Sequence, residues 1–161
     1  GQMDPNISHV MPVLNSPLLS LHVSAIMFSF ALLAMTFICG VTALAIAATR
    51  KAIGNSRTGA PEALRVLSLI FLHPALATLA VGIFIGAVWA NVSWGTYWGW
   101  DPKEVWALIT MMVYAVGVHA GSLPSLRRPL TYHIFTTAAF LTVLMTYFGV
   151  NYVLGGMHSY A

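Results

Sequence analysis

Four long stretches of apolar residues constrain the fold of this chain more than any other feature. They run from about Pro17 to Ala48, Val66 to Ala90, Glu104 to Ala120 and Leu130 to Leu154. A helix needs about 20 apolar residues to cross a hydrocarbon core about 30 Å thick. Only 7% of the residues are charged, whereas soluble domains carry about 25%. We therefore expect an all-α, polytopic integral membrane helical bundle with about four transmembrane helices in a lipid bilayer.

The basic residues lie in two short clusters between these stretches. Six of the seven Lys and Arg residues share one side of the membrane in this arrangement: Arg50, Lys51, Arg57, Arg65, Arg127 and Arg128. Basic loops face the cytoplasm in membrane proteins, so the N-terminal stretch, the loop from Asn91 to Lys103 and the C-terminal tail are predicted to lie outside. So few basic residues in such loops are typical of a membrane protein, and we expect no nucleic acid partner.

The chain shows no internal repeat, low-complexity tract or second domain. We therefore expect a single domain over residues 1–161. The sequence begins with Gly1 instead of Met, and the residues before Leu18 lack the basic start and small-residue cleavage site of a signal peptide. These features suggest the C-terminal part of a longer protein.

A tryptophan-rich segment, WGTYWGWDP, stands in the predicted outer loop. Its candidate binding residues are Trp94, Gly95, Tyr97, Trp98, Gly99, Trp100 and Asp101. If the segment is helical, Trp94 and Trp98 share one face and Gly95 and Gly99 a neighbouring one, because residues four apart are neighbours on a helix. Small residues beside large flat rings leave a slot for a planar aromatic ligand. The alternative is a belt of aromatic residues at the membrane interface, which needs neither interleaved glycines nor an Asp-Pro ending.

Asp101 immediately precedes Pro102, a residue well suited to the first position of a helix. We expect Asp101 to cap the third transmembrane helix through its carboxylate.

Two stretches of sequence resemble a known family. The run WANVSWGTYWGWDPKEVWALI resembles the WWD segment of the cytochrome c assembly protein family, and the ending MTYFGVNYVLGGMHSYA resembles the C-terminus of its System II, CcsA-type branch. The resemblance implies a protein that binds heme b (iron protoporphyrin IX). It further implies that heme is presented at the extracytoplasmic face for covalent attachment to the CxxCH motif of apocytochrome c.

The same resemblance implies partners and a location. The partner would be a companion membrane protein of the CcsB/ResB type, and the location the bacterial inner membrane, with the WWD segment facing the periplasm. The chain would be the heme-presenting part of a holocytochrome c synthase (heme lyase) complex. No conventional catalytic acid or nucleophile is expected, because heme and the substrate thiols carry the reactivity.

Three histidines match places in this family pattern. His22, at the outer end of the first span, and His158, just beyond the fourth, are expected to be axial ligands of one outer heme. His119 lies near the cytoplasmic end of the third span, too far to reach that iron, and resembles the transmembrane histidine of an inner heme site. His73 is an open candidate for its partner, although Pro74 beside it offers a plain structural interpretation, a kink in the helix.

Two other functions fit the same residues. One is a membrane electron-transfer protein with a permanent bis-histidine heme, and the other is a System I heme-delivery protein. Electron-transfer proteins of this kind usually hold both ligands within a four-helix core, whereas His22 and His158 flank an outer loop.

Overall fold

The computed structural model describes residues 16–52 and 59–154, and within these ranges it consists of helices and short connections without a strand. The long helices are α2 (Pro17–Ala52), α3 (Ala60–Trp94), α4 (Pro102–Val118) and α5 (Pro129–Leu144). Two 3₁₀ turns, η2 (His119–Gly121) and η3 (Pro124–Leu126), connect α4 to α5. A π-helix, η4 (Met145–Leu154), continues α5. The prediction of an all-helical protein is confirmed for the described residues.

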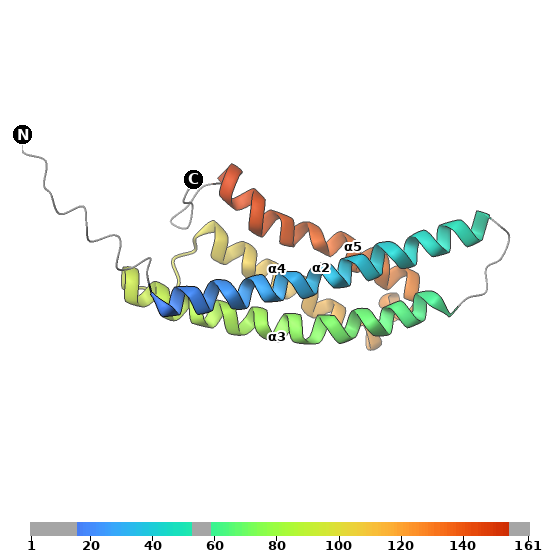
Figure 1. Cartoon of the computed structure of the whole chain (residues 1–161), viewed down its shortest axis with the longest axis horizontal. Helices are drawn as coiled ribbons and strands as arrows, with labels where there is room; N and C mark the ends of the chain where they lie inside the picture. The colour runs from blue at the N-terminus through green and yellow to red at the C-terminus, as the bar shows by residue number, and fades with distance from the viewer. Residues whose placement is uncertain (1–15, 53–58, 155–161) are drawn as a thin grey trace, which may run out of the picture.

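The long helices run back and forth between two ends of an elongated bundle. In Figure 1 the start of α2, the end of α3, the start of α4 and the end of η4 all lie toward one end. The end of α2, the start of α3 and the turn between α4 and α5 lie toward the other, where Arg50, Lys51, Arg65, Arg127 and Arg128 are found. We call these the tryptophan end and the basic end.

All four predicted membrane spans are confirmed. Within the part of the chain that the structure describes, four helices are long and apolar enough to cross a membrane: Pro17–Ala52, Ala60–Trp94, Pro102–Gly121 and Pro129–Tyr152. The first two are longer than the apolar stretches suggested: α2 has 36 residues and α3 has 35. At about 1.5 Å per residue each measures more than 50 Å, so each must extend beyond a hydrocarbon core of about 30 Å. The chain is an integral membrane protein.

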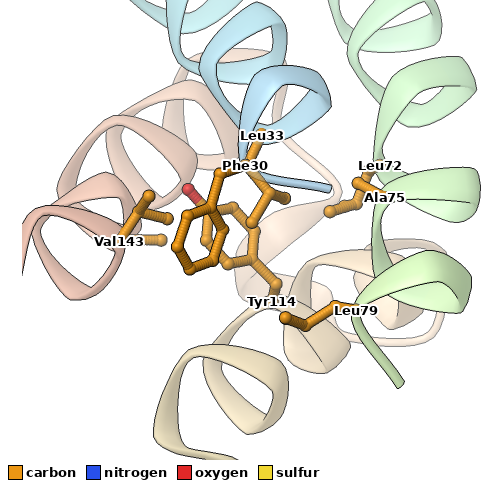
Figure 2. Packing of buried hydrophobic residues seen from close by; sticks show 8 residues of the cluster. Phe30, Leu33, Leu72, Ala75, Leu79, Tyr114 and Val143 are labelled. Carbon is orange, nitrogen blue, oxygen red and sulfur yellow. The ribbon is translucent and has the colours of Figure 1, made fainter. Parts of the chain in front are cut away.

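A cluster of apolar side chains in the middle of the bundle holds the helices together. Figure 2 shows Phe30 and Leu33 of α2 facing Leu72, Ala75 and Leu79 of α3, with Tyr114 of α4 and Val143 of α5 closing the cluster. Leu33, Leu72, Leu79 and Tyr114 are fully buried. Polar contacts between helices supplement this packing, as where the Ser29 hydroxyl donates to the Ala75 carbonyl over 2.7 Å. Within a membrane, close packing and such hydrogen bonds hold helices together.

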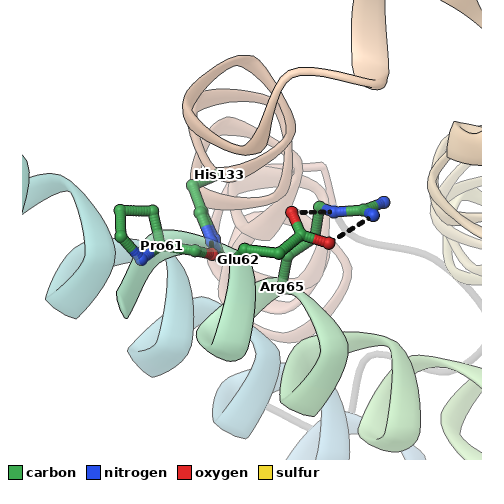
Figure 3. A network of polar contacts seen from close by, with 4 residues as sticks. All are labelled: Pro61, Glu62, Arg65 and His133. Carbon is green, nitrogen blue, oxygen red and sulfur yellow. Dashed lines mark hydrogen bonds and ion pairs between the residues drawn. The ribbon is translucent and has the colours of Figure 1, made fainter. Parts of the chain in front are cut away.

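A second polar contact closes the basic end. His133 of α5 is fully buried, and its Nε2 lies 2.9 Å from the carbonyl oxygen of Pro61 in the first turn of α3. Beside it, Arg65 donates to both carboxylate oxygens of Glu62, over 3.0 and 2.7 Å (Figure 3). Because the carbonyl can only accept, Nε2 carries the proton. His133 therefore joins α5 to α3, a structural role.

Replacing the core residue Leu72 with Ala should destabilise the bundle by at least about 2 kcal/mol, because it leaves a cavity among side chains that cannot close over it. Ile70→Ala in the same helix is the control, since Ile70 is 61% exposed and its loss leaves no internal cavity. Thermal unfolding of both variants in the same detergent would measure the difference. Equal loss of stability would show that α3 does not pack as described.

Candidate functional site

The tryptophan-rich segment is not helical, and the predicted helical stacking of its residues is wrong. Helix α3 ends at Trp94, and Gly95 follows with a φ of 77° and its N–H bonded to the Asn91 carbonyl. A left-handed glycine just after the last helical residue ends a helix, because other residues adopt this conformation only at a cost. Residues 95–101 therefore cross the end of the bundle as irregular backbone.

The tryptophans consequently pair edge to face and do not form parallel walls. Trp94 packs against the buried Trp89 with ring centroids 4.9 Å apart and an interplanar angle of 75°. Trp98 packs against Trp100 at 6.0 Å and 88°. The helical stacking from which the slot was predicted is therefore not present, and Trp98 lines the cavity described below whereas Trp94 does not.

The predicted cap at Asp101 is confirmed. Its carboxylate accepts the backbone N–H of Lys103 over 3.0 Å, and Glu104 reaches back to the backbone N–H of Asp101 over 3.2 Å. This reciprocal arrangement is a capping box. The same Glu104 oxygen also accepts the N–H of Gly99 over 2.9 Å. The two carboxylates thus fasten the irregular segment to the first turn of α4.

A cavity of about 210 Å³ lies at the tryptophan end, beneath this segment. All four long helices or their continuations line it, together with the segment itself, and most of its wall is apolar. The lining residues are Leu19, His22, Val23, Ile26, Met27 and Phe30 of α2; Ile83, Gly86 and Ala87 of α3; Tyr97 and Trp98; Lys103, Glu104 and Ala107 of α4; and Thr146, Tyr147 and Asn151 of η4.

Among the described residues, His22 is the histidine that lines this cavity, and α3 sets its orientation. Its Nδ1 lies 2.8 Å from the carbonyl oxygen of Gly82. A carbonyl only accepts, so Nδ1 carries the proton and Nε2 carries the lone pair that metal ligation requires. Gly86, one turn further along α3, lets the ring approach: a methyl group there would lie 2.5 Å from His22 Cε1 and 2.7 Å from Nδ1.

A polar contact between α4 and η4 also lines the cavity. Lys103 Nζ of α4 donates to Asn151 Oδ1 of η4 over 2.7 Å, and Asn151 Nδ2 donates to the Tyr147 carbonyl over 2.7 Å. Deeper in the bundle the hydroxyls of Thr110 and Thr146 lie 2.9 Å apart, and the Thr146 hydroxyl also donates to the carbonyl of Thr142 in the last turn of α5. These bonds hold η4 against α4 along the cavity.

The structure brings three of the predicted site residues together: His22, Tyr97 and Trp98 line the cavity. The other predicted residues of the segment, Trp94, Gly95, Gly99, Trp100 and Asp101, shape or cap it without lining the cavity. His158, the other predicted ligand, lies outside the described residues. Any role it has at this cavity stays a prediction.

His119 and His73 lie away from the cavity. His119 follows the last residue of α4, about 24 Å along the helix axis from Lys103 at 1.5 Å per residue, and its side chain is exposed. His73 is also exposed, with Nδ1 2.7 Å from the Leu69 carbonyl of its own helix. This local contact favours the structural interpretation of His73. Helix α3 continues through Pro74 without ending there.

Sequence reasoning missed Gly82, Gly86 and Asn151 as parts of the site. Two signals could have indicated them. Gly82 and Gly86 are spaced four apart in a membrane helix, a spacing that allows close approach of a neighbouring helix. Asn151 is a polar residue in a largely apolar span, where polar side chains usually face the bundle interior.

These features define a class: a polytopic membrane protein with a mostly apolar cavity at one end of a helical bundle, walled by a histidine, aromatic rings and a lysine. The sequence matches the family described as "Cytochrome C assembly protein" over residues 1–158. The chain belongs to this family, which acts in cytochrome c biogenesis and handles heme. The predicted family resemblance is confirmed.

The chain is similar to several proteins of cytochrome c biogenesis. It is 37% identical to the protein NrfI of Wolinella succinogenes over 161 residues, which is 100% of this chain and 18% of NrfI. It is 34% identical to the cytochrome c biogenesis protein CcsA of Chlamydomonas reinhardtii, over 95% of this chain and 43% of that protein. It is 35% identical to CcsA of Prochlorococcus marinus (strain MIT 9215), over 95% of this chain and 57% of that protein. The chain thus spans from about a fifth to just over half the length of these relatives.

Replacing Gly86 with Ala should displace the His22 ring and break its bond to Gly82, because three ring atoms lie within 3.3 Å of the added methyl group. The ¹⁵N chemical shifts of the His22 imidazole in detergent micelles would report the change, because they depend on which ring nitrogen carries the proton and on whether Nδ1–H is hydrogen-bonded.

Gly82→Ala is the matched control for this experiment. Its methyl group would meet the flexible side-chain end of Ile26 at 2.7 Å instead of a rigid ring. The control should leave the His22 resonances near their wild-type positions. An equal change of the His22 ¹⁵N chemical shifts in both variants would contradict a specific role of Gly86 in positioning the His22 ring.

Proposed function

We propose that this chain binds heme b at the tryptophan end of the bundle and presents it for covalent attachment to apocytochrome c, as in System II cytochrome c biogenesis. The observation that carries the proposal is the shared cavity of His22, Tyr97 and Trp98. Heme is the cargo: its iron is held by the axial ligands, and its vinyl groups react with the thiols of the CxxCH motif. The chain's own residues bind and orient it.

The residues of the cavity fit such a cargo. The His22 imidazole donates its Nδ1–H to the Gly82 carbonyl, so its Nε2 carries the lone pair that can ligate iron. The same hydrogen bond also holds the ring in place. Apolar walls and aromatic rings suit the faces and edges of a porphyrin. His22 is therefore the proposed ligand on this side.

His158 is the proposed second axial ligand. Leu154, the last described residue of η4, lies at the tryptophan end, and three residues separate it from His158 in the sequence. Bis-histidine ligation makes heme iron low-spin and closes both axial positions. His158 is named on the family resemblance and this proximity along the chain.

The positions of the histidines favour presentation at the end of the bundle over permanent storage in its core. An electron-transfer heme held in the core would need two histidines facing each other. The histidines in the described part of the bundle lie apart from one another: His22, His73, His119 and His133.

His119 is the proposed residue of an inner heme site. It is exposed at the basic end, which the positive-inside rule assigns to the cytoplasm. An intramembrane histidine near that side is a natural first contact for heme made in the cytoplasm. Its distance from the cavity requires two sites acting in series.

The proposed partners are apocytochrome c and a companion membrane protein of the CcsB/ResB type. Apocytochrome c would approach the tryptophan end from the periplasm of a bacterial inner membrane. With these partners the chain would form part of a holocytochrome c synthase complex.

Topology reporters should place the two ends of the bundle on opposite sides of the membrane. A reporter fused after Ser56 should be cytoplasmic and one fused after Ser93 extracytoplasmic, because the basic clusters stay inside. Alkaline phosphatase, active only outside, and a fluorescent protein, active only inside, give complementary readouts. Cytoplasmic signals from both fusions would contradict the orientation and the periplasmic site.

Substituting the proposed ligands should change the spin state or the amount of the heme bound to the chain. His22→Ala should convert a low-spin, six-coordinate absorption spectrum into a weaker or high-spin one, because one axial bond is lost. His119→Ala should deplete heme at the outer site while leaving its spectrum low-spin, if the inner site supplies it. Absorption spectra of purified protein, with covalent heme on a CxxCH reporter, would measure both effects.

His73→Ala is the control for these substitutions, since His73 contacts its own helix and lies outside the cavity. It should keep wild-type spectra and reporter maturation. A low-spin spectrum retained in the double variant of His22 and His158 would exclude these ligands. Wild-type outer heme in His119→Ala, at equal protein yield, would remove the inner site from the proposal.

A further inference from the structure

The contact between α2 and α5 extends from the basic end to the middle of the bundle. The ring of Phe37 stacks on that of Phe140 with centroids 4.5 Å apart, and further outward Phe30 and Val143 pack in the same core cluster. Beyond this pair, toward the tryptophan end, α2 separates from α5 and its continuation η4 (Figure 1). The cavity begins where this contact ends.

Three side chains at the resulting gap line the cavity and are also exposed on the outside of the bundle. Val23 and Met27 of α2 are 47% and 44% exposed, and Tyr147 of η4 is 42% exposed. Side chains that face both a cavity and the outside stand at the edge of an opening. In the described part of the chain, the cavity is therefore open sideways between α2 and η4.

This opening lies at the depth of the hydrocarbon, in the half of the membrane nearer the tryptophan end. The span Pro102–Gly121 has 20 residues, about 30 Å of helix, so Pro102 lies near the boundary of the hydrocarbon. Tyr114 lies about 18 Å inward from Pro102, near the middle of the membrane, and Phe30 packs in its cluster. Met27 lies about 4.5 Å outward from Phe30 along α2. An apolar molecule dissolved in the bilayer can therefore reach the opening.

The core cluster closes the direct route to the cavity from the opposite end. Leu33, Leu72, Leu79 and Tyr114 are fully buried and fill the middle of the bundle between the cavity and the basic end (Figure 2). Close packing of this kind leaves no passage for a molecule as large as a porphyrin. A ligand that comes from the basic end, where His119 lies, must therefore reach the cavity from outside the bundle.

We propose that the gap between Val23 and Met27 of α2 and Tyr147 of η4 is a lateral entrance, through which a planar, apolar ligand passes from the bilayer into the cavity. The inference rests on the proposed function, in which this ligand is heme. Most of the porphyrin surface is apolar, so heme dissolves in lipid, and its flat shape suits a gap between two helices. Tyr97, which lines the cavity and is 60% exposed, marks a different side for presentation.

The test places a removable block at the entrance, in protein reconstituted in lipid vesicles. Met27→Cys is modified with benzyl methanethiosulfonate, a bulky apolar reagent whose disulfide a reductant cleaves. Heme uptake is followed by the absorption of histidine-ligated heme, and release by transfer to excess apomyoglobin. Modification before heme is added should slow uptake by about fivefold or more, because it raises the barrier to passage. Modification after loading should slow release by a similar factor, whereas damage to the binding site would speed release.

Each variant is compared with its own unmodified form. Phe28→Cys is the matched control, because Phe28 is the next residue of α2, is 56% exposed and does not line the cavity. Its modification should leave both rates unchanged. Wild-type protein treated in parallel reports any reaction of the buried Cys39. Cleaving the disulfide and removing the reductant should restore the rates of Met27→Cys, and Val23→Cys gives the same readout if Met27→Cys does not fold.

The outcomes separate the entrance from the proposed function. Slower uptake in modified Tyr97→Cys but not in modified Met27→Cys would place the entrance at the tryptophan end and overturn the inference. Equal slowing in Phe28→Cys, or a Met27→Cys thiol that does not react, would overturn it too. Wild-type protein that takes up no histidine-ligated heme overturns the proposed function and the entrance together. Slower uptake and slower release in Met27→Cys but not in Phe28→Cys support both.

Discussion

The membrane's intolerance of unpaired backbone groups determines where this protein can place anything other than helix. A backbone N–H or carbonyl left without a partner in hydrocarbon costs several kcal/mol, so irregular backbone is confined to the ends of the spans or to the bundle interior. Residues 95–101 illustrate the solution at the tryptophan end. Gly95 ends α3, and the carboxylates of Asp101 and Glu104 accept the N–H groups of Gly99, Asp101 and Lys103. The segment can therefore hold Tyr97 and Trp98 over the cavity in a fixed position.

The same constraint explains which parts of the structure were predictable. Spans are visible in sequence because each must be apolar over its whole length, and all four were predicted. The cap at Asp101 was predictable because Asp followed by Pro is a local signal for the start of a helix. Helical stacking of Trp94 and Trp98 was a wrong prediction, because Gly95, in the left-handed conformation, ends α3 between them. Whether a glycine packs within a helix or ends it depends on the neighbouring structure, which local sequence does not reveal.

The contacts that build the cavity join residues far apart in the chain. Sixty positions separate His22 from Gly82, and 48 separate Lys103 from Asn151. No periodicity links such pairs, since they depend on how the helices are rotated against one another. His22 could be nominated from sequence, but the carbonyl that orients it and the glycine that admits its ring could not. These are the features that determine which nitrogen of His22 faces a ligand.

His22 and Lys103 line the same cavity from two different parts of the bundle. Helix α2 packs extensively against α3, so the His22 ring is fixed relative to the bundle core. Lys103 and Asn151 instead join the start of α4 to η4, near the end of the described chain. The cavity is therefore walled on one side by a helix pair packed along the core, and on another by a contact made only near the end of the bundle. Its shape depends on both, because displacing either pair of helices would separate residues that line it together.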